Sequence, residues 1–148
     1  MIPAKDTQNY RGTILVNPGG PGGSGTDLVE RAGAKIRHVV GDSFDILGFD
    51  PRGTGASVPR ANCFDTDAQK KIWELQDGDR LLNISSPSTV SFSRARQQLV
   101  ADRCERLIGG PEGIARFMST ASVARDMLEI TEKLGQKNLQ YWGFVSFS

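Results

Sequence analysis

A dense run of glycines between an apolar run and a helical pattern limits the possible folds of this chain more than any other feature. The run is Asn17-Pro18-Gly19-Gly20-Pro21-Gly22-Gly23-Ser24-Gly25. So many glycines are needed only where the backbone takes positive φ values or comes close to another group. In open α/β sheets, ligands bind at the carboxyl ends of the strands. The tract therefore predicts a functional loop at the edge of a parallel sheet.

Apolar patterns on both sides of the glycine tract predict an α/β fold. Residues 12–16 form a short β-branched apolar run, which is typical of a strand buried on both faces. Residues 26–40 have a helical period and stop at Gly41, and residues 44–50 form a second buried strand. The side chains expected on one face of this helix are Leu28, Ala32, Ile36 and Val39. This order predicts an open parallel sheet with helices on its faces.

The second half of the chain repeats this pattern after an interruption. Residues 119–135 form the clearest helix, and residues 138–144 follow as a third strand. The candidate N-caps are Ser119, Thr120 and Ser122, and the expected apolar face is Val123, Met127, Ile130 and Leu134. Before this helix, helical patterns at 68–75 and 95–108 flank a serine-rich loop at 85–93. We expect residues 61–115 to form a helical insertion packed beside the sheet.

Composition and cysteine usage narrow the range of partners. There are 18 Lys and Arg residues against 17 Asp and Glu, so the chain has no charge pattern suited to nucleic acid or an anionic membrane. No apolar run approaches the roughly 20 residues that span a bilayer, and no signal peptide is visible in this chain. Cys63 and Cys104 form either one disulfide or two buried free thiols. Their spacing fits no zinc pattern, and we expect neither a metal nor another cofactor.

The glycine tract has three possible interpretations. It can direct backbone N–H groups at a developing oxyanion during acyl transfer. It also formally matches the dinucleotide-binding fingerprint, with Asp50 as the ribose-binding acid. However, Pro18 and Pro21 remove backbone donors, and Asp50 comes later than the fingerprint's spacing of about 20 residues. The third interpretation is a turn without a ligand. We favour the oxyanion loop, with Gly19 and Gly20 as its candidate donors.

A second motif follows the second predicted strand. It reads Asp50-Pro51-Arg52-Gly53-Thr54-Gly55-Ala56-Ser57, which is a strong turn signal. At the carboxyl edge of the sheet, this turn would lie beside the glycine tract. We therefore expect Asp50 and Arg52 to support the two loops, with the guanidinium of Arg52 joining them through backbone carbonyl groups.

These two motifs, in this order, resemble the tripeptidyl-aminopeptidase-like branch of the proline iminopeptidase family. Residues 119–127 resemble the helix that precedes the nucleophile in that family, and Tyr141-Trp142-Gly143-Phe144 resembles the strand that enters it. The resemblance implies an α/β-hydrolase fold and serine hydrolysis of peptide or small-molecule ester and amide bonds. It also implies that Gly19 or Gly20 supplies one oxyanion-hole N–H, and that relatives are secreted enzymes.

The resemblance fails at the nucleophile. A Gly-x-Ser-x-Gly elbow would place serine at position 145, but that residue is Val145, and Ser146 comes one position late. A displacement of one residue along a strand turns the side chain to the opposite face. The one histidine, His38, lies on the first predicted helix, whereas the family's triad histidine follows the acid downstream. We therefore expect no catalytic residue here, with His38 at the surface.

Our expectation for residues 1–148 is the incomplete amino-terminal portion of a single α/β-hydrolase domain. We expect it to be inactive and poorly stable as an isolated chain, with Val145–Ser148 translated from an intron. Two alternatives remain open, which are a non-catalytic scaffold or binding partner and a nucleotide-binding module. Fold alone does not choose between substrates, because one fold hosts many activities.

Overall fold

The computed structural model describes residues 1–20, 22–77 and 87–144, which fall into two compact units. The first unit combines Met1–Arg60 with Phe117–Ser148, and the second is Ala61–Arg116.

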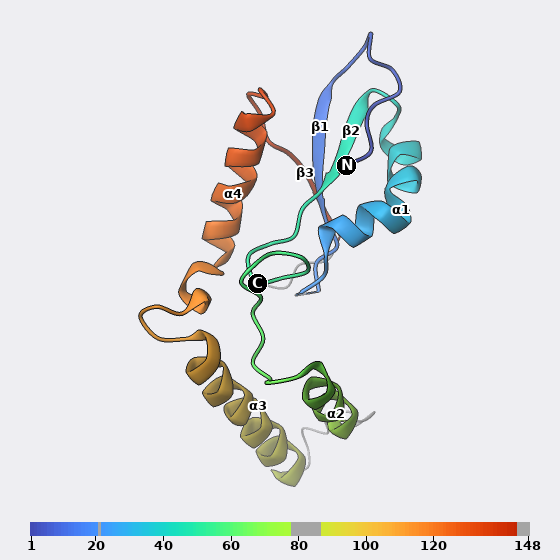
Figure 1. Ribbon diagram of the computed structural model, residues 1–148. Helices are drawn as coiled ribbons and strands as arrows, with labels where there is room; N and C mark the ends of the chain where they lie inside the picture. The colour runs from blue at the N-terminus through green and yellow to red at the C-terminus, as the bar shows by residue number, and fades with distance from the viewer. Residues whose placement is uncertain (21, 78–86, 145–148) are drawn as a thin grey trace. The chain divides into compact units, whose positions relative to one another are not determined.

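The first unit is built on a parallel three-stranded sheet (Figure 1). Strands β1 (Gly12–Asn17), β2 (Phe44–Gly48) and β3 (Gln140–Gly143) lie in the order β2-β1-β3. Ile14 of β1 pairs with Ile46 on one side and with Gln140 on the other. The three strands and the parallel sheet predicted from the apolar runs are therefore confirmed in the described residues.

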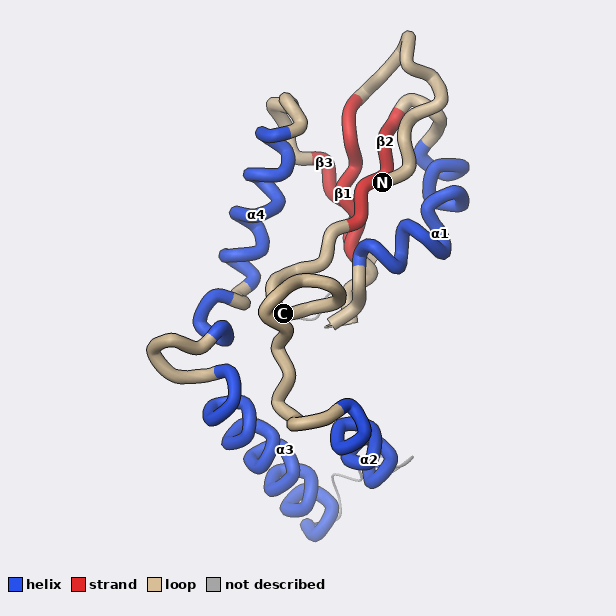
Figure 2. The backbone as a smooth tube through the Cα atoms, in the orientation of Figure 1, coloured by secondary structure: helices blue, strands red, loops and turns tan. Residues whose placement is uncertain are grey.

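Two helices cover the sheet, one on each face (Figures 1 and 2). They are α1 (Gly25–Val40) and α4 (Thr120–Lys133). The neighbouring residues Leu15 and Val16 point to opposite faces of β1, and only 1% and 0% of their surfaces are exposed. Burial on both faces explains why β1 is a continuous apolar run rather than an alternating one.

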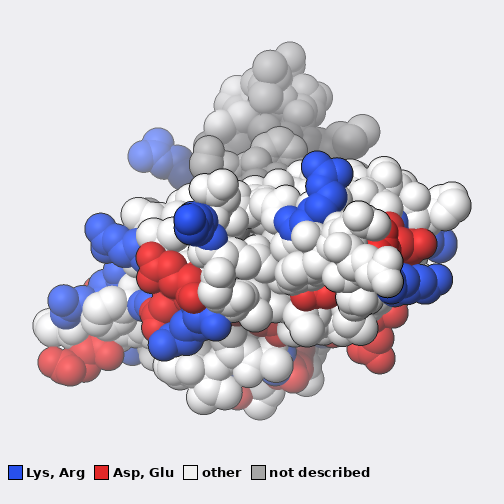
Figure 3. All heavy atoms as spheres, turned by 90° about the horizontal axis from the view of Figure 1, so that it is seen from above, with Lys and Arg blue, Asp and Glu red and all other residues white. Residues whose placement is uncertain are grey.

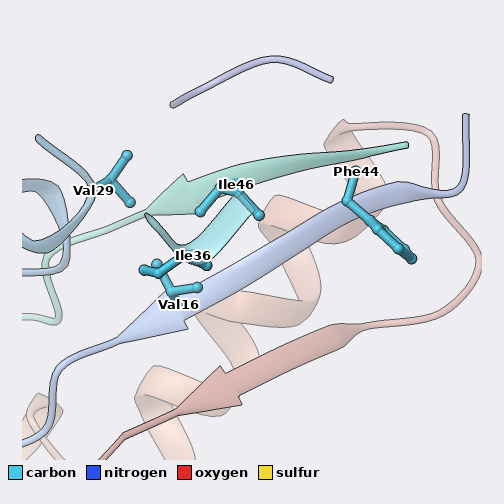
Figure 4. Packing of buried hydrophobic residues seen from close by; sticks show 5 residues of the cluster. All are labelled: Val16, Val29, Ile36, Phe44 and Ile46. Carbon is cyan, nitrogen blue, oxygen red and sulfur yellow. The ribbon is translucent and has the colours of Figure 1, made fainter. Parts of the chain in front are cut away.

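The core of this unit lies between α1 and the sheet. Figure 4 shows its five side chains, which are Val16, Val29, Ile36, Phe44 and Ile46. The predicted inner face of α1 was partly wrong, because Val39 is exposed and the buried positions are Gly25, Val29, Gly33 and Ile36. A hydrophobic pattern does not identify glycine as a buried residue, but a glycine without a side chain lets α1 pack closely against its neighbours. A Cβ atom at Gly33 would overlap the side chain of Ile2.

The start of the chain adds to the sheet beside β2. Ile2 and Ile46 form an antiparallel bridge, in which each N–H donates to the carbonyl oxygen of the other residue at 2.8 and 2.9 Å. The outer edge of β2 is therefore partly paired. Strand β3 forms the opposite edge of the described sheet.

The second unit holds two helices and a disulfide. Helix α2 is Asp67–Asp77, α3 is Pro87–Ile108, and the short 3₁₀ helix η1 follows at Ile114–Phe117. Cys63 and Cys104 form the disulfide, which decides between the two alternatives left open by the sequence. The serine-rich loop predicted at 85–93 was wrong from Pro87 onward, because α3 begins there. Proline favours the first helical position, where its missing N–H costs no bond. Residues 85 and 86 lie outside the described residues.

Arginines stack on aromatic rings inside the second unit. The guanidinium of Arg96 lies 3.9 Å from the centre of the Trp73 ring and donates to the Trp73 carbonyl oxygen at 2.7 Å. Arg103 lies over Phe64 and donates to the Cys63 carbonyl oxygen at 3.0 Å. Among the described residues, every fully buried hydrophobic side chain belongs to the first unit. The second unit is therefore held by its disulfide and by these polar and aromatic contacts.

On the face seen in Figure 3, basic side chains are interspersed with acidic ones. Within the described residues, no helix combines the length and the apolar character that crossing a membrane requires.

Candidate functional site

The glycine tract begins at the carboxyl end of the central strand. Asn17 ends β1 and pairs with Gly143 of β3, and the next N–H along the chain, that of Phe144, donates to the Asn17 carbonyl oxygen at 3.0 Å. From β1 the chain passes first to β2 on one side and later to β3 on the other. The tract therefore lies where the strand order reverses, which is the position at which open α/β sheets bind ligands.

Hydrogen bonds within the glycine tract fix its path. Gly19 and Gly20 have φ values of 80° and 129°, which explains why glycine is needed there. The Gly19 N–H donates to Asn17 Oδ1 at 2.7 Å, and the Gly19 carbonyl oxygen accepts from the Gly23 N–H at 3.0 Å. Among the described residues, the N–H of the exposed Gly20 has no hydrogen-bond partner. The two candidate donors therefore differ, because the Gly19 N–H is bonded within the tract and the Gly20 N–H is bonded to no described residue.

The end of the tract forms the start of helix α1. Ser24 is the N-cap, and its hydroxyl oxygen accepts from the Asp27 N–H at 3.1 Å. The same hydroxyl donates to Asp50 Oδ1 at 2.8 Å. Gly25 packs against the backbone of Phe49, where a Cβ atom would overlap the Phe49 carbonyl oxygen. This close approach brings the helix start against the end of β2.

Asp50 connects the helix start to the turn that follows β2. Its Oδ1 accepts from the Thr26 N–H at 3.1 Å, and its Oδ2 accepts from the Ala56 N–H at 2.8 Å. The Ser57 hydroxyl donates to the Asp50 carbonyl oxygen at 2.7 Å. Partial burial alone would raise the pKa of Asp50. The hydrogen bonds from the Ala56 and Thr26 N–H groups and from the Ser24 and Thr26 hydroxyls outweigh burial, so the pKa is lowered.

The position of Asp50 bears on the dinucleotide interpretation. A pyrophosphate in that kind of site binds at the helix N-terminus through backbone N–H groups. Here the carboxylate of Asp50 already accepts the Thr26 N–H of that turn. A bound phosphate would meet a negative charge at the same place. The geometry therefore argues against dinucleotide binding at this loop.

Removing the Asp50 carboxylate is expected to destabilise the first unit. Asp50→Ala loses several hydrogen bonds to a charged group and should lower the free energy of unfolding by about 2 kcal/mol. Asp50→Asn should also destabilise this unit, because an amide has only one oxygen and cannot accept hydrogen bonds at both positions. Its NH₂ group would face either the Thr26 N–H or the Ala56 N–H. Urea denaturation followed by circular dichroism measures both variants.

The lowered pKa of Asp50 sets the direction of the pH dependence. The ionised carboxylate of Asp50 contributes fully to the stability of the fold above its unfolded-state pKa of about 3.9. This contribution is lost as the pH falls through the lower folded-state pKa. Wild type should therefore lose stability on acidification more steeply than Asp50→Ala. If the free energy of unfolding falls equally steeply with pH in the two proteins below pH 4, the lowered pKa of Asp50 is contradicted.

Arg52 connects the same turn to helix α4. Its Nε and one terminal nitrogen donate to the two carboxylate oxygens of Asp126 at 2.7 and 2.6 Å. The hydrogen bond from Arg52 lowers the pKa of Asp126, against the opposing effect of partial burial. The sequence predicted backbone carbonyl groups as the partners of Arg52, and the structure gives it a carboxylate instead. It is Asp50 that joins the turn to the glycine tract.

Several residues of this site were missed by sequence reasoning. They are Asn17, Ser24, Thr26 and Asp126. Asn17 had a detectable signal, because asparagine before glycines commonly accepts a backbone N–H two residues on. His38 is exposed in the last turn of α1. The predicted nucleophile position at Val145 and the neighbouring Ser146 lie outside the described residues.

Comparison with known proteins finds hydrolases. No family model matches the chain. It is 37% identical over 121 residues to carboxylesterase B of Mycobacterium tuberculosis, covering 78% of this chain and 21% of that protein. It is 31% identical to the tripeptidyl aminopeptidase of Streptomyces coelicolor over 135 residues and to the serine protease Hip1 of M. tuberculosis over 138 residues. Each of these covers 90% of this chain, which spans about a quarter of either protein.

Proposed function

We propose that this chain, which is related to hydrolases, forms the part of an α/β-hydrolase that carries the oxyanion loop. The reaction is acyl transfer to water from a peptide or from an ester or amide. The observation that carries this proposal is the glycine tract at the reversal of strand order, where Asn17 is bonded to Phe144 after β3 and the Gly20 N–H has no partner among the described residues. The proposal includes a single domain in which residues 61–115 form a helical insertion.

The chemistry requires donors that are in place before the reaction. Attack on a carbonyl carbon leaves a negative charge on its oxygen, and fixed N–H groups stabilise that charge because they need no rearrangement. In an α/β-hydrolase the second donor belongs to the residue after the nucleophile, which follows a strand of the sheet. The end of β3 is bonded to the residue that starts the glycine tract. A nucleophile placed after β3 would therefore face this loop.

The isolated chain lacks the means to activate such a nucleophile. A serine hydrolase needs a general base within hydrogen-bond reach of the serine. The only histidine of this sequence is His38, which is exposed near the end of α1. Strand β1 runs toward the tract and α1 starts from it, so the last turn of α1 lies at the other end of the helix. We infer that the base and the acid of the triad come from sequence outside this chain.

A pair of proteins tests this function. One is the 148-residue chain, and the other is a chimera in which this chain up to Phe144 replaces the matching region of the Streptomyces tripeptidyl aminopeptidase. Both are treated with a fluorophosphonate probe and assayed for hydrolysis of tripeptide and ester substrates. We expect the chimera to be labelled and active, and the isolated chain to be neither.

Two controls make the outcome interpretable. A chimera with its nucleophilic serine replaced by alanine reports background labelling, and thermal melting reports whether each protein is folded. A folded chimera that neither labels nor turns over substrate would contradict the proposed loop function. Specific labelling of the isolated chain would contradict the inference that the base and the acid come from outside it.

A further inference from the structure

We propose that Asn17 is a positioning residue that leaves the Gly20 N–H, and not the Gly19 N–H, as the oxyanion donor. This inference rests on the proposed function, since it names the donor and the side chain that selects it. Asn17 does not contact the reacting atoms in this account. It acts through the backbone of the two glycines that follow it.

Asn17 makes two different hydrogen bonds at the site. Its side-chain Oδ1 accepts from the Gly19 N–H at 2.7 Å, and its carbonyl oxygen accepts from the Phe144 N–H at 3.0 Å. The first bond closes a turn over the start of the glycine tract. The second joins that turn to the end of β3. One residue therefore sets the position of the tract relative to the strand that would lead to the nucleophile.

Both backbone groups of Gly19 are used within the tract. Its N–H donates to Asn17 Oδ1, and its carbonyl oxygen accepts from the Gly23 N–H at 3.0 Å. An N–H held in a short, local hydrogen bond would have to break that bond before it could stabilise a new negative charge. A preorganised oxyanion donor has no such cost. Gly19 is therefore the poorer of the two candidates.

Gly20 has the properties that an oxyanion donor needs. It is exposed, and its N–H has no partner within the described part of the chain. Its φ value of 129° disfavours other residues, and a Cβ atom there would lie 3.2 Å from the backbone nitrogens of Gly22 and Gly23. The tight path of the tract thus holds the Gly20 N–H in one direction, provided that the Asn17–Gly19 turn stays closed.

Amide hydrogen exchange in the full 148-residue chain tests this assignment without any catalytic activity. In ¹⁵N-labelled wild type, the Gly19 amide should exchange about tenfold more slowly than the Gly20 amide. Asn17→Leu, which removes the acceptor, should abolish the Gly19 protection. Asn17→Asp, which keeps an oxygen acceptor, should restore it. The amides of Leu15 and Val16 in β1 report whether each variant stays folded.

Three results would overturn the proposal. They are an unprotected Gly19 amide in wild type, unchanged Gly19 protection in a folded Asn17→Leu variant, and loss of that protection in a folded Asn17→Asp variant. If Asn17→Leu fails to fold, the exchange rates of Gly19 and Gly20 in wild type and the Gly19 protection in Asn17→Asp still test the proposal. An inactive chimera together with a protected Gly19 amide would contradict the hydrolase function and leave the assignment of the turn intact.

Discussion

Reducing the Cys63–Cys104 disulfide is expected to unfold the Ala61–Arg116 unit and to leave the three-stranded sheet folded. The bond joins residues 41 positions apart, and chain entropy for a loop of that length corresponds to about 4 kcal/mol. The unit has little else to replace that contribution, because no described side chain in it is a fully buried hydrophobe. Its other described contacts include ion pairs that are not buried, arginine–aromatic stacks and the Phe64–Trp73 ring pair, which contribute about 0.5–2 kcal/mol each.

Hydrogen exchange measured by mass spectrometry with and without dithiothreitol checks this expectation. Peptides from α3 should lose protection on reduction, whereas peptides from β1 and β2 should keep it. The double variant Cys63→Ser/Cys104→Ser is the matched control, because it should exchange like the reduced wild type and should not respond to the reductant. Unchanged protection of α3 after complete reduction would show that the unit is held by other contacts.

Local patterns were sufficient to predict the sheet but not the packing of its helices. The runs at 12–16 and 44–50 became β1 and β2 because a parallel strand buried on both faces must be apolar throughout. The inner face of α1 was misjudged because its contacts with Ile2 and Phe49 depend on glycines that hydrophobicity does not detect. Likewise, the serines after Pro87 were read as a loop, although a proline at the first helical position favours a helix.

The location of the candidate site was predictable, and its internal bonding was not. Glycines directly after a buried strand must lie at the carboxyl edge of a parallel sheet, which is where the structure has Gly19 and Gly20. The partner of Arg52 is Asp126, 74 residues away along the chain, and no local pattern indicates such a pair. The contact between Asp50 and the start of α1 also depends on how the helix docks against β2. For the same reason, the sequence did not decide whether Cys63 and Cys104 form a disulfide.

Removing the Gly20 N–H should have the largest effect on catalysis in the active chimera. Glycolic acid at position 20, introduced by semisynthesis, replaces the N–H with an ester oxygen and adds no side chain at this position of positive φ. Loss of one oxyanion donor should lower kcat by about 10²–10³-fold, because the charge on the tetrahedral intermediate loses a preorganised partner. KM should change little, since that charge is absent from the bound substrate.

The same replacement at Gly22 provides the matched control. Gly22 also has a positive φ and an exposed backbone, but it lies two residues farther along the tract. Its ester should reduce kcat by less than tenfold, which separates the loss of a donor from a general effect of backbone esters on the loop. Thermal melting of both esters shows whether the fold is retained.

The ratio of kcat between the Gly20 ester and the unmodified chimera tests the central claim most directly. Our account predicts a ratio of about 10⁻² to 10⁻³ with KM nearly constant. A folded Gly20 ester that turns over substrate within twofold of the unmodified chimera would contradict it.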